Sequence, residues 1–187
     1  MEGKGIIFAM DNSTRRLEKG RRRYKKAGVH NVEVRSLEDE KNRKWLRRQK
    51  NAMDVVLVDA PCSSSGTWRR NPDLRWNWYG PTLEEITVLQ AEILERVADK
   101  VKHGGKLVYA TCSLFKSENE AQIEAFLKNH PDYSLVDIAK EWPEGPACPV
   151  TGPYLRLNPK DHGTDGFFTA VLQRHIEDAE EDAIISE

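Results

Sequence analysis

The stretch VVLVDAPCSSSGTWRRNPDLRW runs from Val55 to Trp76 and joins a strand pattern to chemically active side chains. Its first part belongs to MDVVLVDAP, which is apolar on both faces, as the central strands of parallel sheets are. The strand leads into Asp59-Ala60-Pro61-Cys62, and a loop rich in arginine and tryptophan follows. Cys112 ends the next clear strand pattern, KLVYATCS. Two of the chain's three cysteines therefore follow its two clearest strands.

Strand and helix patterns alternate as far as His130. Strands are expected at Ile6–Met10, Asn31–Arg35, Asp54–Val58, Lys106–Ser113, Tyr133–Ile138, Leu155–Pro159 and Gly166–Arg174. Helices are expected at 12–28, 37–50, Pro81–Lys102 and 117–130, and a loop at Trp142–Tyr154. The first helix has Asn12 or Ser13 as its cap and Gly28 as its stop. Gly104-Gly105 is expected to end the third helix, and a capping box of Ser117 and Glu120 to open the fourth.

This alternation predicts an α/β fold, with a parallel sheet covered by helices on both faces. In such sheets ligands bind at the carboxyl ends of the strands. Asp11, Asp59, Cys62 and Cys112 all fall at those ends. Their shared placement predicts a functional site at this edge of the sheet.

The composition is that of an ordinary globular chain of 187 residues, with 39% hydrophobic and 32% charged residues and a net charge of −1. No apolar run approaches the roughly 20 residues of a membrane span, so no membrane contact is expected. Three irregularly spaced cysteines favour a reducing cytoplasm over a disulfide framework. Basic residues dominate between Arg15 and Lys50, a pattern compatible with nucleic-acid binding but also common on helix faces of proteins that bind no nucleic acid.

Each of the acidic and thiol residues has more than one explanation. Asp11 is placed to bind the ribose hydroxyls of an adenosine cofactor, but it would also serve as a helix cap. Pro61 stiffens the strand exit and lacks an N–H, which leaves the Asp59 carboxylate facing a ligand. Cys62 is either part of that site or simply buried, as cysteines often are. Cys112 becomes a nucleophilic thiolate if a nearby cation or helix N-terminus lowers its pKa.

The third cysteine, a possible metal site and the loop after Cys62 each have a structural explanation as well. Cys148, in the proline-rich loop, has no comparable placement and we treat it as incidental. Zinc needs about four N or S ligands, and the chain has no CxxC motif or histidine pair, so no metal is expected. The loop GTWRRNPDLRWNW combines arginines that can hold phosphates with tryptophans that can stack on unpaired bases. An ordered surface loop with its tryptophans folded onto the core explains the same composition.

Two segments together resemble the signature motifs of the RNA 5-methylcytosine methyltransferases. They are DAPCSSSGTWRRNPD, beginning at Asp59, and YATCSLFKSENEAQIEAFL, beginning at Tyr109. AMDNSTRRLEKGRRRYKKAGVHNVEV resembles the family's stretch after its cofactor-binding glycine loop, and HGTDGFFTAVLQR resembles its closing strands. The resemblance covers Gly3 to Arg174. The family includes bacterial ribosomal-RNA cytosine methyltransferases and their eukaryotic nucleolar relatives.

The resemblance implies a class I, Rossmann-like methyltransferase fold and S-adenosylmethionine as cofactor. It implies methylation of cytosine C5 in RNA, with ribosomal RNA as the expected target and a covalent cysteine–C6 adduct. By the family pattern Cys112 is the nucleophile, and Cys62 assists release of the methylated product. Asp59 would contact the cytosine edge or the cofactor, and Asp11 the cofactor ribose. RNA binding falls to the loop residues Arg69, Arg70, Arg75 and Trp68, because a stacked base must leave its helix to react.

The chain departs from the family pattern at three places. Ser64 stands where the family usually has glycine. Ser36-Leu37 stands where an acidic residue usually reaches the adenine, so that role is left unassigned. The Gly-rich cofactor loop and the first strand would precede residue 1. Without that strand, the strands at Ile6–Met10 and Asp54–Val58 would have unpaired edges.

We therefore expect residues 1–175 to form a partial methyltransferase catalytic domain, and 176–187 a disordered acidic tail. A missing N-terminal half or a second copy of the chain would complete the sheet, and the isolated chain would bind cofactor weakly or not at all. One rival hypothesis is a catalytically silent RNA-binding or partner-binding remnant. Another is a thiol-dependent hydrolase, which would need a histidine beside Cys112.

Overall fold

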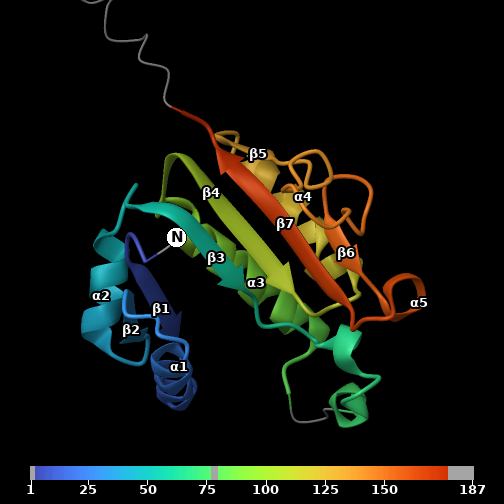
Figure 1. Ribbon diagram of the computed structural model, residues 1–187, viewed down its shortest axis with the longest axis horizontal. Helices are drawn as coiled ribbons and strands as arrows, with labels where there is room; N and C mark the ends of the chain where they lie inside the picture. Colours follow the sequence, from blue (N-terminus) through green and yellow to red (C-terminus); the bar gives the residue numbers. More distant parts are fainter. Residues whose placement is uncertain (1–2, 77–79, 177–187) are drawn as a thin grey trace, which may run out of the picture. The chain divides into compact units, whose positions relative to one another are not determined.

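The computed structural model describes residues 3–76 and 80–176, which form two compact units, residues 1–49 and 50–187 (Figure 1). The predicted acidic tail, except for Ile176, and Trp78 of the arginine- and tryptophan-rich loop lie outside the described residues. No helix among the residues described here is long and apolar enough to cross a membrane.

The first unit is a βαβα segment around a two-stranded parallel sheet. Its elements are β1 (Ile7–Asp11), α1 (Thr14–Lys26), β2 (Val32–Ser36) and α2 (Glu40–Arg48). Ser13 caps α1 by accepting a hydrogen bond from the Arg16 amide, and Gly28 follows the helix with a φ of +68°. Asp39 caps α2 in the same way. The two strands and two helices predicted for this segment are confirmed.

The second unit is a five-stranded mixed sheet with helices on one face. Its elements are β3 (Met53–Asp59), α3 (Leu83–Ala98), β4 (Val101–Thr111), α4 (Glu120–Asn129), β5 (Tyr133–Leu135), β6 (Leu155–Leu157), α5 (Pro159–His162) and β7 (Phe167–Arg174). The strand order is β3-β4-β7-β5, and β6 also pairs with β7. β3 and β4 are parallel, whereas β7 runs antiparallel to its neighbours. Figure 1 shows α3 and α4 behind the same face of this sheet.

The core of the second unit lies between that face and its helices. Leu107 and Tyr109 of β4 and Phe168 of β7 have no exposed surface, and α3 and α4 contribute Leu94 and Ile123. A fully buried apolar side chain is worth about 1.5–3 kcal/mol, so this layer supplies most of the unit's stability.

The boundary between α3 and β4 differs from the prediction. The helix ends at Ala98, and Gly104-Gly105 lies inside β4 instead of ending a helix. Val101 is fully buried and pairs with Met53, so it belongs to the sheet. The register then shifts before Val55, and the glycines allow this irregularity: a Cβ on Gly105 would lie 2.8 Å from the Asp54 carbonyl oxygen. Val101 fits the apolar spacing of the predicted helix, although it belongs to β4, so the sequence pattern placed the end of the helix too late.

β3 is apolar on both faces, a pattern typical of central parallel strands, but in this chain one of its edges was expected to be open. β3 is the end strand of the second unit's sheet, with β4 at one edge. Val58 points into the core, but Val55 and Leu57 on the other face are 60% and 66% exposed. The open edges expected for the strands at Ile6–Met10 and Asp54–Val58 are confirmed, because among the described residues β1 pairs only with β2 and β3 only with β4.

Shortening an apolar side chain to alanine is expected to lower the free energy of unfolding by different amounts on the two faces of the sheet. Leu107→Ala is expected to lower the free energy of unfolding by about 2–5 kcal/mol, because it leaves a cavity in the core. Leu57→Ala is expected to change it by less than about 0.5 kcal/mol, because the side chain is mostly in solvent. Urea unfolding followed by circular dichroism measures both. A large loss from Leu57→Ala would contradict the exposure of this face.

Candidate active site

The strand ends bring two cysteines together. Asp59 at the end of β3 lies opposite Ala110 of β4, and the Ala60 amide donates to the Ala110 carbonyl oxygen at 2.9 Å. The chain then reaches Cys62 on one side and Cys112 on the other. Their Sγ atoms lie 3.4 Å apart, within hydrogen-bond distance for sulfur, and both cysteines are free thiols.

This contact separates the acidities of the two thiols. A hydrogen bond from Cys62, together with one from the Ser64 side chain, lowers the pKa of Cys112 to about 6. The same contact and burial raise the pKa of Cys62. These opposite shifts in pKa favour the form with the negative charge on Cys112 and the proton on Cys62. A thiolate at neutral pH is the nucleophilic form of cysteine.

The loop after Cys62 takes a conformation that most residues avoid. Ser64 has a φ of +56° and a ψ of +23°, in the left-handed region that favours glycine. Its carbonyl oxygen accepts from the Thr67 amide and hydroxyl, both at 2.9 Å, which fixes the turn. The glycine that the family pattern has here thus suits the backbone, and the chain accommodates a serine instead.

Gly66 ties this loop to the rest of the sheet by close backbone approach. Its amide donates to the Cys112 carbonyl oxygen at 2.9 Å, and its own carbonyl oxygen accepts from the Gly166 amide at 2.8 Å. A Cβ on Gly66 would lie 2.5 Å from the Gly166 carbonyl oxygen. The absence of side chains at Gly66 and Gly166 lets three chain segments meet beside the thiols.

A buried polar cluster underlies the two cysteines, and sequence analysis missed it. Glu118, at the end of a 3₁₀ turn over Lys116–Glu118, has no exposed surface. Its Oε1 accepts from the Ser63 amide at 2.7 Å, and its Oε2 from the Ser63 hydroxyl at 2.5 Å. The Ser113 hydroxyl also donates to Oε2, and the Gln90 side chain donates to Oε1 at 3.2 Å. The available signal was the pair of serines, each directly after a cysteine.

The capping box predicted for Ser117 and Glu120 is wrong. Asn119 occupies the cap position of α4 without a side-chain cap, because its Oδ1 accepts from Thr111 and its Nδ2 donates to the Ser113 carbonyl oxygen. Glu120 pairs with Arg156 instead. The capping box of this unit is formed by Thr82 and Glu85 at the start of α3.

The two aspartates predicted to bind cofactor lie in different units. Asp59 is exposed at the end of β3, and its charge acts on Cys112 by raising the pKa of that thiol. Asp11 ends β1 in the first unit, where its carboxylate accepts from the Ser13 amide at 2.6 Å and pairs with Arg16 at 3.2 Å. Asp11 therefore stabilises the start of α1, as the capping interpretation predicts, and retains acceptor positions for a ligand.

The loop predicted to bind RNA is ordered by its own contacts. Arg69 and Arg70 pair with Asp165, and Arg75 lies over the rings of Trp68 and Trp76. Trp68 packs edge-on against Phe115, with ring centroids 5.9 Å apart. Trp76, another tryptophan of this loop, is 62% exposed and offers the freer aromatic surface.

The other candidate groups lie elsewhere. His130 bonds to Glu95, and His162 to backbone groups of Pro149 and Asn158, so neither provides the base that a thiol hydrolase needs. No group of three or more potential metal ligands occurs in the described part of the chain.

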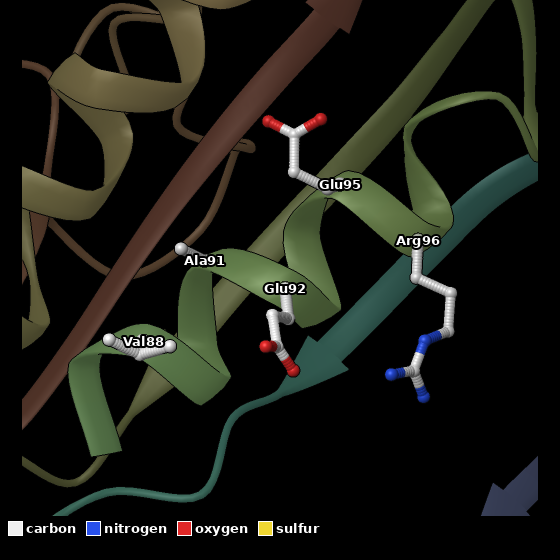
Figure 2. Close-up of a pocket in the computed structure, with 5 residues that line it drawn as sticks. All are labelled: Val88, Ala91, Glu92, Glu95 and Arg96. Carbon is white, nitrogen blue, oxygen red and sulfur yellow. The ribbon is translucent and has the colours of Figure 1, made fainter. Parts of the chain in front are cut away.

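Figure 2 shows a surface hollow on α3 lined by Val88, Ala91, Glu92, Glu95 and Arg96. The buried residues of α3, including Gln90, are different ones, so this hollow is separate from the polar cluster.

Comparison with known proteins extends over nearly the whole chain. The family model described as 16S rRNA methyltransferase RsmB/F matches residues 1–173. The "probable ribosomal RNA small subunit methyltransferase B" of Synechocystis sp. is 37% identical over 93% of this chain. The match covers 39% of that relative, so the chain spans well under half of its length.

Solved structures show the same similarity. PH0851 is 37% identical, with a TM-score of 0.76 over 93% of this chain and 38% of its own. NSun6 from Pyrococcus horikoshii, solved with SFG, is 28% identical, with a TM-score of 0.68 over 95% of this chain and 43% of its own. These matches confirm the Rossmann-like α/β methyltransferase fold that the resemblance predicts.

The thiol contact predicts how Cys112 reacts. With Cys148 replaced by serine, alkylation of Cys112 by iodoacetamide is expected to have a pH midpoint near 6. Cys62→Ala removes the donor and should raise that midpoint toward the ordinary thiol value of about 8.5. Peptide mapping by mass spectrometry follows each site. Identical midpoints in the two proteins would contradict the shared proton.

The left-handed conformation of Ser64 predicts that a glycine at this position is more stable than an alanine. Ser64→Gly and Ser64→Ala both lose the hydroxyl, but only glycine removes the Cβ that strains a left-handed residue. Ser64→Gly is therefore expected to be more stable than Ser64→Ala by about 1 kcal/mol. Urea unfolding of the two variants measures the difference, and equal stabilities would contradict a strained turn.

Proposed function

This chain belongs to the RsmB/F family of 16S rRNA methyltransferases, and we propose that it methylates carbon 5 of cytosine in ribosomal RNA with S-adenosylmethionine as methyl donor. The observation that carries this proposal is the 3.4 Å contact between Cys62 and Cys112 at the carboxyl ends of two parallel strands. The chain matches only 39% of its Synechocystis relative, so the activity in that relative's name comes to this chain as a proposal.

Cys112 acts first in the proposed reaction. Carbon 5 of cytosine is a poor nucleophile, but addition of a thiolate to carbon 6 makes carbon 5 enamine-like. The lowered pKa of Cys112 favours its thiolate at neutral pH, which supports this role. Bound S-adenosylmethionine supplies an electrophilic methyl group for carbon 5. The Cys112 sulfur then remains bonded to carbon 6 until the carbon-5 proton is removed.

Cys62 is placed to act second. While Cys112 is a thiolate, the proton between the sulfurs stays on Cys62, whose pKa is raised. Bond formation to carbon 6 removes the negative charge from Cys112, so the reason for that raised pKa weakens. Cys62 can then lose its proton to solvent water, and its thiolate accepts the carbon-5 proton while the electrons of the C5–H bond form the C5–C6 double bond and the Cys112–C6 bond breaks, which returns Cys112 as a thiolate. Two thiols would thus serve for attachment and release.

Asp11 and Asp59 fit a cofactor with ribose hydroxyls. A carboxylate accepts up to about four hydrogen bonds, and among the described residues of its unit the Asp11 carboxylate accepts two, from the Ser13 amide and from Arg16. Asp59 is exposed at the strand end and near enough to Cys112 to affect its pKa. Asp11 would accept from the ribose, and Asp59 from the exocyclic amine of cytosine or from the cofactor.

The arginine- and tryptophan-rich loop would hold the RNA. Its ion pairs to Asp165 are mostly exposed and so worth only about 0–1 kcal/mol, which leaves Arg69 and Arg70 able to exchange them for phosphates. Arg75 is exposed beside the Trp68 and Trp76 rings, where a flanking unpaired base could stack.

A catalytically silent remnant is the competing proposal. The open edges of β1 and β3 and the exposed outer face of β3 favour it, because each invites pairing with another chain. A remnant that only binds RNA or a partner would form no covalent RNA adduct, whereas the proposed enzyme must form one.

Variants of the two cysteines test the proposed roles. In assays with labelled S-adenosylmethionine and a ribosomal RNA transcript, Cys112→Ala is expected to reduce methyl transfer by several orders of magnitude, because the nucleophile is lost. Cys62→Ala is expected to trap an RNA–protein adduct that survives denaturing electrophoresis, because release is blocked. Cys148→Ala is the matched control and should behave as the parent protein does. Equal, adduct-free inactivity of folded Cys62→Ala and Cys112→Ala would refute the assigned roles.

A further inference from the structure

Glu118 is a buried carboxylate that binds the residues following both cysteines. Ser63 comes directly after Cys62 and donates to Glu118 through its amide at 2.7 Å and its hydroxyl at 2.5 Å. Ser113 comes directly after Cys112 and donates through its hydroxyl. One carboxylate therefore links the loop after β3 to the loop after β4, one residue away from each thiol.

Gln90 adds a third connection to the same carboxylate. It is fully buried on α3, and its Nε2 donates both to Glu118 Oε1 at 3.2 Å and to the Pro61 carbonyl oxygen at 2.8 Å. Pro61 directly precedes Cys62, so the Cys62 loop is held from both sides. The backbone of Glu118 is fixed as well, because the Tyr109 hydroxyl donates to its carbonyl oxygen at 2.7 Å.

The chemistry of this cluster suits a carboxylate at its centre. Two oxygens offer about four acceptor positions, and four donors occupy them. All four donors are neutral, and Glu118 has no ion pair with any lysine, arginine or histidine of the described chain. Burial of an unpaired carboxylate is costly, and an apolar residue would avoid that cost. The cost points to a function in arranging its donors.

We infer that Glu118 is a positioning residue that holds the Cys62 and Cys112 loops at the spacing where their thiols share a hydrogen bond. The inference rests on the proposed function for its purpose, since the paired thiols are the proposed catalytic groups. Its structural content stands on the contacts of Glu118 alone.

Positioning and direct electrostatics predict opposite changes in the thiols. Two titratable groups affect the pKa of the Cys112 thiol: Cys62 lowers it and Asp59 raises it. If the charge of Glu118 acted on Cys112 directly, its removal would lower the pKa of that thiol, because a nearby negative charge disfavours a second one. If Glu118 acts by positioning, its removal loosens the hydrogen bond from Cys62 and raises that pKa. A purely structural residue would change neither.

The test is the pH dependence of Cys112 alkylation in Glu118→Gln, with Cys148 replaced by serine. Glutamine keeps the shape but replaces one acceptor oxygen by a donor, which opposes the serine hydroxyls. The expected result is a rise in the midpoint by about one unit or more, a tenfold lower thiolate-to-thiol ratio. Asp132→Asn is the matched control, since it breaks the ion pair with Arg174 and should leave the midpoint unchanged.

An unchanged or lowered midpoint in folded Glu118→Gln would overturn the inference, even if the thermal midpoint falls. If this variant does not fold, Ser63→Ala removes one donor and should raise the alkylation midpoint by a smaller amount; no rise there overturns the inference too. The titration needs neither RNA nor cofactor. A raised midpoint together with no adduct in Cys62→Ala would refute the proposed function and leave the positioning role standing.

Discussion

Parallel hydrogen bonding between β3 and β4, in the register that sets Asp59 opposite Ala110, brings the ends of two strands to one edge of the sheet. The cysteines that follow these strands are fifty residues apart in sequence and 3.4 Å apart at their sulfurs. β7 reinforces the arrangement from the far side of β4, because Gly166, just before β7, donates to Gly66 in the Cys62 loop. Every candidate role in the second unit depends on this junction.

At that junction the surrounding groups are polar, buried and largely neutral. The thiol contact places negative charge on one sulfur and a proton on the other, and serine hydroxyls and backbone amides supply the remaining hydrogen bonds. Unpaired buried polar groups are costly, so the four hydrogen bonds that Glu118 accepts restrict the geometry of the two loops, while Gln90 Oε1 has no partner among the described residues. The Ser64 turn and the Gly66–Gly166 approach carry the backbone past it. Local strain and close packing thus accompany the reactive pair.

Much of this arrangement could be predicted from the sequence, and the failures have physical causes. The strand–cysteine pattern at Cys62 and Cys112 was visible because each cysteine follows a run of apolar residues with a strand pattern. The end of α3 was misplaced because Val101 continues the helical periodicity while belonging to β4. Glu118 was missed because a buried carboxylate has the same sequence signal as an exposed one. Its role depends on donors from Ser63, Gln90 and Ser113, which only the folded chain brings together.

The central claim is that Cys62 and Cys112 titrate as one unit that holds a single proton. Ultraviolet absorbance of thiolate, recorded against pH in the folded chain with Cys148 replaced by serine, counts the thiolates directly. One thiolate per chain is expected to appear near pH 6, and the second only well above the ordinary thiol value of about 8.5. Two thiolates appearing together near that ordinary value would contradict the claim.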